Sequence, residues 1–195
     1  DRFVATPRNT SRLEAVGNNR VVAIEDKQWT RPRLIDAQTG AVLSQGGMIY
    51  AGALGATADG NTVFVGQSAV SSASVIRYSL ATGQFTEIGR SNHGTGASYP
   101  ARSAVAVPDG SGIYYAGYLF DGHNLGVLRY PVAGPILAVS PDGRLALSSS
   151  HVYDVATGNH FSLPVTASAV AISPNGAKAF LWTGSGIIPL DLTAF

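Results

Sequence analysis

Two short turn sequences recur along the chain, and they constrain its fold more than any other feature. The first ends an alternating apolar run with Asp-Gly or Asn-Gly, as in LGATADG, AVAVPDG, LAVSPDG and VAISPNG. The second ends in Gly four residues after Asp36, Ser79 or Asp154. Asp-Gly and Asn-Gly supply the positive φ angles of tight hairpins. A short oxygen-bearing side chain can accept amide hydrogen bonds in the second turn.

The two turns divide the chain into similar units. Each unit is predicted to contain a strand, an Asp-Gly turn, a strand, a variable loop, a strand, a Thr-Gly turn and a strand. Four antiparallel strands per repeated unit are typical of a β-propeller, whose units are called blades. We expect an all-β propeller forming one domain over residues 1–195, with five blades at about 11–51, 52–100, 101–134, 135–166 and 167–195.

Two blades are expected to be irregular. In the third, LRYPVAG resembles a third strand with its turn, and only 9 residues separate Gly134 from Gly143, which predicts a missing or very short fourth strand. The fifth stops before its fourth strand. RFVAT at Arg2–Thr6 is predicted to supply that strand, with residues 1–6 completing the blade, because ring closure removes open sheet edges. An arc cut from a larger ring is the alternative.

The core is predicted from the alternating apolar residues of the first two strands of each unit. These strands are rich in Ala and Val, which suits the crowding of blades near a common axis. The expected core positions include Val105, Val107, Leu137, Val139, Leu145, Leu147, Val170, Ile172 and Phe180.

Three segments carry a resemblance to a known repeat family. AVSPDGRLAL (138–147), HVYDVATGNHF (151–161) and AISPNGAKAFLW (171–182) resemble the bacterial YVTN and WD40-like propeller repeats. The resemblance implies the architecture and says little about function, since such repeats occur in lactonases and surface-layer proteins alike. No lactonase or cofactor motif can be matched, and five units are fewer than the seven that are common in that family.

Composition excludes several classes of protein. Thirteen Lys and Arg residues against twelve Asp and Glu give a net charge of +1, which provides no general attraction for nucleic acid. The chain has no cysteine, so it is no disulfide scaffold, zinc ribbon or thiol enzyme. It has no apolar run long enough to span a membrane. The missing cysteine and the bacterial character of the repeat favour an extracellular, cell-surface or periplasmic bacterial protein.

The variable loops are the candidate binding surface. They lie at 25–33, 44–52, 89–102 and 119–126, and the topology is expected to gather them on one rim, where recognition residues usually lie. Aromatic and Arg side chains are typical of such surfaces, although Trp29 and Tyr50 could instead simply fill their loops. The candidate ligand-binding residues are Trp29, Arg31, Tyr50, Arg90, His93, Tyr99, Arg102, Asp121 and His123.

Catalytic motifs are not found in the sequence. No HExxH metal motif or nucleophile elbow is present, and no pair of acidic residues has glycosidase character. We therefore predict no catalytic residue, metal or cofactor, and favour a recognition or scaffold module that binds a protein or a glycan. One alternative is a small lactonase-like hydrolase or ligand carrier with His93, Asp121 and His123 at the central channel. Another is a self-associating component of a surface layer or filament.

Overall fold

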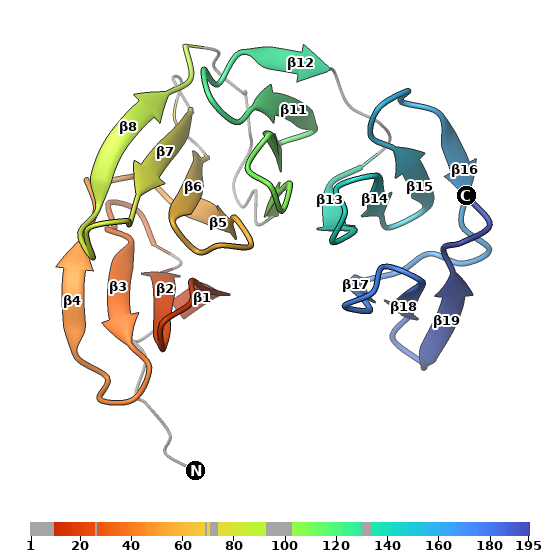
Figure 1. The fold of residues 1–195 in the computed structure, drawn as a ribbon, viewed down its shortest axis with the longest axis horizontal. Helices are drawn as coiled ribbons and strands as arrows, with labels where there is room; N and C mark the ends of the chain where they lie inside the picture. Colours follow the sequence, from red (N-terminus) through yellow and green to blue (C-terminus); the bar gives the residue numbers. More distant parts are fainter. Residues whose placement is uncertain (1–9, 26, 69, 71–73, 93–102, 130–133) are drawn as a thin grey trace.

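The chain folds into five consecutive antiparallel sheets. The computed structural model describes residues 10–25, 27–68, 70, 74–92, 103–129 and 134–195, and within these ranges it contains strands and no helix. Each sheet is a meander in which successive strands pair. Figure 1 shows the sheets arranged along an arc, with the first strand of each sheet innermost and the last outermost. This is the predicted β-propeller arrangement, with the predicted number of blades.

The strand bounds follow the predicted repeat. The first sheet contains β1 (Thr10–Ala15), β2 (Arg20–Glu25), β3 (Arg33–Asp36) and β4 (Val42–Gln45). The second contains β5 (Gly52–Ala56), β6 (Thr62–Gln67), β7 (Val75–Ser79) and β8 (Thr86–Arg90). The third contains β9 (Ala104–Ala106), β10 (Gly112–Tyr115), β11 (Tyr118–Asp121) and β12 (Val127–Arg129).

The last two sheets differ in their number of strands. The fourth contains β13 (Ile136–Val139), β14 (Leu145–Ser148), β15 (His151–Asp154) and β16 (His160–Ser162). The fifth has three strands, β17 (Ala169–Ile172), β18 (Lys178–Trp182) and β19 (Ile187–Asp191). Its fourth strand is absent from the described residues, as predicted. The predicted pairing of Arg2–Thr6 at this edge lies outside the described residues.

Both turn types lie on the same side of the arc, which we call the turn face. In every sheet, an amide at the second turn donates a hydrogen bond of 2.7 to 2.9 Å to a carbonyl at the first turn. The five donor–acceptor pairs are Ala37–Asn19, Leu80–Asn61, Gly122–Ser111, Val155–Arg144 and Leu192–Ala177. Because the strands are antiparallel, the remaining connections lie on the opposite side, which we call the loop face.

Side chains of the Ser-Pro-Asp-Gly sequence hold the first turn together. The Ser140 hydroxyl donates to Asp142 Oδ1 at 2.5 Å and accepts from the Leu145 amide at 2.8 Å. Asp142 Oδ1 also accepts from the Arg144 amide at 3.0 Å. The Thr57–Asp59 and Ser173–Asn175 pairs make equivalent hydrogen bonds in the second and fifth sheets. The recurrence of a Ser or Thr two residues before Asp or Asn is therefore explained by the hydrogen bonds that these side chains make within the turn.

The second turn depends on its aspartate, as predicted. Asp154 Oδ1 accepts from the Thr157 amide at 2.7 Å and Asp36 Oδ1 accepts from the Thr39 amide at 2.7 Å. Ser79 Oγ accepts more weakly, at 3.4 Å from the Ala81 amide. Hydrogen bonds donated by the turn lower the pKa of the Asp36 and Asp154 carboxyl groups, because they stabilise the charged form.

The core consists of sheet-on-sheet contacts between neighbouring blades. Each innermost strand packs against the innermost strand of the next sheet, from β1 to β5, β9, β13 and β17. Phe64 of the second sheet is fully buried against the third sheet. A Cβ atom at Gly66 would lie 2.4 Å from the Tyr115 ring, so this glycine makes room for the aromatic side chain of the next blade.

The third sheet corrects the prediction for its strands. Ala116 and Gly117 have φ angles of 49° and 83° and connect β10 directly to β11 as a two-residue turn, which suits a tight hairpin. Tyr118–Asp121 is therefore the third strand and Val127–Arg129 the short fourth strand. The segment LRYPVAG was predicted to be the third strand, and that assignment is wrong because the Ala-Gly turn ends the second strand earlier.

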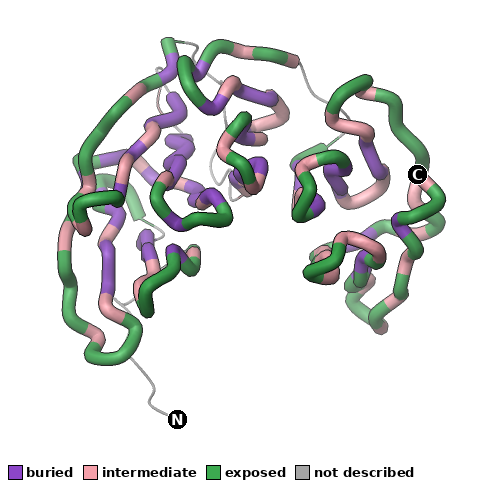
Figure 2. The backbone as a smooth tube through the Cα atoms, viewed as in Figure 1, coloured by how far each residue is buried: buried purple, intermediate pink, exposed green. Residues whose placement is uncertain are grey.

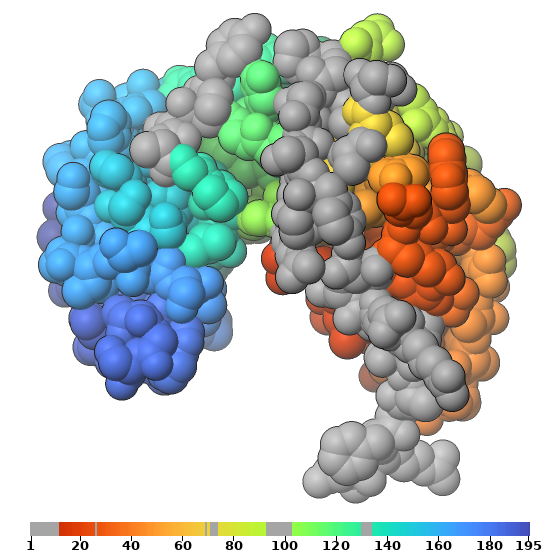
Figure 3. Space-filling model, turned by 180° about the vertical axis from the view of Figure 1, so that it is seen from behind, coloured from red at the N-terminus to blue at the C-terminus, as the bar shows by residue number. Residues whose placement is uncertain are grey.

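The two ends of the arc differ in burial. Figure 1 places the first and fifth sheets at opposite ends, and Figure 3 shows the hollow between their red and blue residues from behind. Figure 2 shows buried residues concentrated in the first three sheets and exposed ones in the fifth. Phe180 was predicted to belong to the core. That prediction is wrong, since Phe180 is 40% exposed and its neighbours Ala179 and Leu181 are buried instead.

We predict that Phe64→Ala destabilises the chain by about 3 to 5 kcal/mol, because it empties a fully buried site between two sheets. Phe180 occupies the equivalent position of the fifth sheet and is the matched control. Phe180→Ala should cost less than about 1 kcal/mol, as expected for a solvent-exposed site. Urea unfolding measures both free energies, and equal losses would contradict the assignment of the two faces.

We predict that the free energy of unfolding falls as the pH drops through the acid range in which aspartate titrates. The turn carboxyl groups have folded-state pKa values below the ordinary 3.8. A lowered pKa contributes stability above the unfolded-state pKa, and that contribution is lost as the pH falls through the folded-state value. Asp154→Asn should make the acid slope shallower, because its amide oxygen still accepts the Thr157 hydrogen bond but does not titrate. An unchanged slope in urea unfolding between about pH 5 and about pH 3 would count against this role.

Candidate functional site

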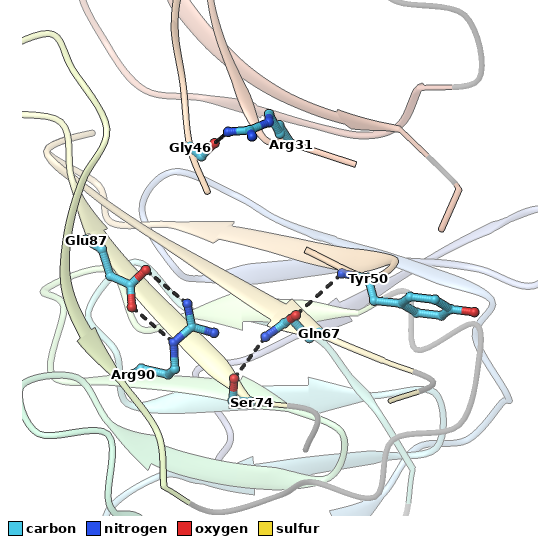
Figure 4. Close-up of polar contacts among 7 residues, drawn as sticks. All are labelled: Arg31, Gly46, Tyr50, Gln67, Ser74, Glu87 and Arg90. Atoms are coloured by element: carbon cyan, nitrogen blue, oxygen red, sulfur yellow. Dashed lines mark hydrogen bonds and ion pairs between the residues drawn. The ribbon is translucent and has the colours of Figure 1, made fainter. Parts of the chain in front are cut away.

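The loop face carries a short ladder that joins the first two sheets. The Thr30 amide donates to the Ile49 carbonyl at 2.9 Å, and the Ile49 amide donates back to the Thr30 carbonyl at 2.8 Å. One partner belongs to the loop between β2 and β3, and the other to the connection between β4 and β5. Arg31 Nη1 reinforces the ladder by donating to the Gly46 carbonyl at 3.2 Å (Figure 4). These two loops therefore form a single structured unit.

Four side chains flank this ladder, and we call them the rim patch: Trp29, Arg31, Met48 and Tyr50. Antiparallel pairing of Thr30 with Ile49 places Trp29 opposite Tyr50, and Arg31 opposite Met48. The Trp29 and Tyr50 rings meet edge to face with centroids 5.2 Å apart. Trp29 is nevertheless 61% exposed. The sequence predicted three of these residues, and Met48 was missed because it has no chemistry that marks it in isolation.

Trp29 also has an unusual backbone conformation. Its φ angle is 54°, in the left-handed region that costs energy for a residue other than glycine. The hydrogen bonds of Thr30 hold the adjacent backbone in place. The fold therefore holds a large aromatic side chain in solvent at some energetic cost.

A buried network of hydrogen bonds centred on Gln67 holds the backbone of Tyr50 in the rim patch. The Tyr50 amide donates to Gln67 Oε1 at 3.4 Å, and Gln67 Nε2 donates to Ser74 Oγ at 3.0 Å (Figure 4). The Tyr115 hydroxyl donates to the Gln67 carbonyl. Burial raises the pKa of Tyr115, so this phenol stays protonated as a donor at neutral pH. The second and third sheets thus both position Tyr50.

The other predicted site residues do not all join the rim patch. Arg90 ends β8 on the loop-face side, and its guanidinium pairs with both Glu87 carboxylate oxygens at 3.0 Å (Figure 4). His93, Tyr99 and Arg102 lie outside the described residues. The placement of Asp121 and His123 on the same rim is wrong. Residues 122–126 connect β11 to β12 on the turn face.

Asp121 has a structural role on the turn face. Its Oδ1 accepts from the His123 and Asn124 amides at 2.8 and 2.9 Å. These bonds lower the pKa of the Asp121 carboxyl group, the Asn124 amide having the largest effect. Asp121 is therefore equivalent to Asp36 and Asp154 in the repeat. Assigning Asp121 and His123 to the central channel is also wrong, because β11 and β12 are the two outer strands of the third sheet.

The centre of the arc, where the sequence analysis considered a channel site, has a groove that neither Asp121 nor His123 lines. This inner groove has a volume of about 260 Å³. It is lined by residues that belong to the five innermost strands or lie next to them. These residues are Arg12, Glu14, Leu54, Ser103, Ala104, Val105, Leu137, Ser168, Ala169 and Val170. Burial raises the pKa of Glu14, and the nearby Arg12 charge opposes that rise.

Glu14 breaks the pattern of the repeat. It lies opposite Val22 in the pairing of β1 with β2. The equivalent innermost-strand residues of the other sheets are Gly55, Val105, Ala138 and Ala171. A carboxylate at a position otherwise occupied by small apolar residues is a signal that alignment of the units could have revealed.

A second cavity lies between the third and fourth sheets. It has a volume of about 200 Å³, and its lining includes Tyr114, Tyr118, Arg129 and Tyr153. Burial raises the pKa of Tyr114 to about 12, so its hydroxyl remains a hydrogen-bond donor. Arg129 Nη2 donates to the Ala156 carbonyl, which joins the outer strand of the third sheet to a turn of the fourth. This guanidinium therefore bridges the two sheets.

Among the described residues, no three His, Asp or Glu side chains converge as metal ligands would. In the same part of the chain, no helix is long and apolar enough to cross a membrane.

Comparisons with known proteins identify the fold. No sequence model of a protein family matches the chain, and no curated protein matches it. Among solved structures, the β-propeller domain of Cps50 (Swd1) from Myceliophteria thermophila is similar, with a TM-score of 0.63 and 12% identity. That match covers 91% of this chain and 62% of the Cps50 chain. TolB from Acinetobacter baumannii is similar with a TM-score of 0.58 and 19% identity, over 83% of this chain and 45% of TolB. The chain therefore spans less than two thirds of either structure, and both support a β-propeller fold.

Proposed function

We propose that the protein is a non-catalytic recognition module that binds another protein through the rim patch. The observation that carries this proposal is the exposed Trp29 ring, held against Tyr50 by a hydrogen-bonded ladder. Trp, Tyr, Arg and Met are the residue types enriched at protein interfaces, and all four occur in this one patch. Rigid anchors lose little conformational entropy on binding.

The chemistry of the rim patch suits binding better than catalysis. Arg31 is the patch's single charged side chain, and its guanidinium is held by the Gly46 carbonyl. Neither a nucleophile nor a general base belongs to the patch. The likeness to other propellers supports a scaffold that presents loops to a partner. Export to the bacterial surface or periplasm and recognition of a glycan stay predictions from the sequence.

We predict that Trp29→Ala raises the Kd of a rim-directed protein ligand by about 30-fold, equivalent to about 2 kcal/mol, the size expected of an interface hot spot. The probes are peptides selected from a random displayed library against the immobilised chain, with affinities measured by biolayer interferometry. Leu128→Ala is the matched control, since Leu128 is exposed on the outer strand of the third sheet.

Two outcomes would contradict the proposal. Selected peptides that bind the Trp29→Ala and Leu128→Ala variants equally tightly would place the binding surface elsewhere. Alternatively, peptide selection could fail while a glycan array yields ligands that Trp29→Ala abolishes, which would make the rim patch a sugar-binding site.

The inner groove supports a second candidate function, which is binding of a small polar molecule at Glu14 and Arg12. Placing a carboxylate in a partly buried groove reduces stability, and perturbed pKa values cluster at functional sites. This candidate corresponds to the ligand carrier considered from the sequence, with different residues at the channel. A thermal-shift screen with organic cations and lactones would test it, since ligands should stabilise the natural chain and not Glu14→Gln.

We predict that Glu14→Gln stabilises the chain at neutral pH. The folded-state pKa of Glu14 is raised above its ordinary value. Its protonated form therefore favours folding below the unfolded-state pKa, and this contribution is lost as the pH rises through the folded-state pKa. The gain of Glu14→Gln in urea unfolding should shrink as the solution is acidified. A gain that is the same at acid and neutral pH would show that charge burial is not its cause.

A further inference from the structure

The fifth sheet has one covered face and one uncovered face. Ala179 and Leu181 point to the fourth sheet and are buried with Leu147. The alternate residues of all three strands are exposed, and we call them the free face: Ala169, Ala171, Lys178, Phe180, Trp182, Ile187, Pro189 and Asp191. Trp182 is 44% and Ile187 65% exposed. Apart from Lys178 and Asp191, which pair across one end, this face is apolar.

The free face is equivalent to the faces that join the other sheets. Equivalent positions of the five sheets are aligned by the residue after the first turn whose carbonyl accepts a hydrogen bond from the amide before that turn. These residues are Arg20, Thr62, Gly112, Leu145 and Lys178. Two residues later stand Val22, Phe64, Tyr114, Leu147 and Phe180. The first four pack toward the following sheet, and Val22, Phe64 and Leu147 are fully buried there. Phe180 is the fifth member of this series.

The cross-strand neighbours repeat in the same way. Leu147 lies opposite Ala138 and Val152, and Phe180 lies opposite Ala171 and Pro189. Small residues on the innermost strand let the next sheet approach closely. A Cβ atom at Gly55, the equivalent of Ala171, would lie 2.9 Å from the Ala106 amide nitrogen. On the fifth sheet, as on a covered sheet, a small residue on the innermost strand, a large one on the second strand and an apolar one on the third therefore lie side by side.

We propose that the free face is the docking surface for one further antiparallel sheet that continues the arc. The side facing Phe180 would carry apolar residues equivalent to Val63, Ile113 and Ala146, which perform this role in the second, third and fourth sheets. The proposal continues an interface that recurs between all adjacent sheets. It is independent of the rim patch, which lies on the first two sheets.

The first sheet is not a free partner for this face. Its side turned away from the second sheet includes Val21, Ala23 and Ile35, the positions that would meet a preceding sheet. Ala23 and Ile35 are already 1% and 2% exposed, and Val21 is half-buried. A second copy of the chain, added head to tail, would meet the same covered surface. A further sheet is therefore the occupant that matches the free face in both register and chemistry.

Trp182 provides a direct reporter, because the chain has only one other tryptophan, Trp29. In a Trp29→Phe background, a second copy of residues 159–195 is fused after Phe195, with the copied tryptophan replaced by phenylalanine. The copy supplies a fourth strand for the fifth sheet and a sixth sheet whose facing side matches Ala179 and Leu181. We expect acrylamide quenching of Trp182 to fall and its emission to shift to shorter wavelength.

Matched variants separate docking from other effects. Phe180→Asp in the extended chain should restore quenching to that of the unextended chain, whereas Leu128→Asp should leave Trp182 protected. Unchanged quenching in the extended chain, including the case in which the added unit stays unfolded by circular dichroism, would overturn the proposal. So would a Trp182 that is already protected in the unextended chain. If protection of Trp182 in the unextended chain increases with protein concentration, a second copy of the chain covers the free face. If the protection does not depend on concentration, another part of the same chain covers it.

Discussion

Every sheet in this fold has two apolar faces, and the need to cover both determines the rest of the structure. An isolated four-stranded sheet cannot bury such faces, so each sheet packs against its neighbours. Close packing near the axis requires small side chains on the innermost strands, and larger ones farther out. Gly55 on β5 meets this need where the third sheet approaches, and Gly66 on the next strand, β6, makes room for the Tyr115 ring. The arc follows from repeating this contact.

The turn face and the loop face differ in how their backbone and side-chain polar groups are hydrogen-bonded. On the turn face, amides and aspartate oxygens satisfy one another within each sheet, as in the pairs Val155–Arg144 and Asp154–Thr157. Little is left there to contact a partner. The described residues of the loop face show no such repeated pattern, and its connections can vary without disturbing the sheets. The rim patch is a case in which two of these connections are joined by hydrogen bonds.

Local turn chemistry made much of the fold predictable, whereas contacts between sheets did not. Asp36 and Asp154 were identified because an Asx turn needs an oxygen at a fixed distance from its glycine. The Ala116–Gly117 turn was missed because alanine rarely adopts a positive φ angle, and this error also misplaced Asp121. Phe180 looked like a core residue because alternation identifies an apolar face but does not say whether another sheet covers it. Glu14 was visible only after the units had been aligned strand by strand.

The rim patch and the free face lie at opposite ends of the arc, and this separation has a physical consequence. Trp29 and Tyr50 are positioned by the first three sheets, which hold most of the buried residues. Trp182 and Phe180 lie on the sheet with the least cover. Within the described residues, the main contacts between sheets join neighbours along the arc, as in other repeat proteins, where stability is a sum of local terms. Covering the free face would therefore stabilise the fifth sheet directly and leave the geometry of the rim patch unchanged, so that one end can serve assembly and the other recognition.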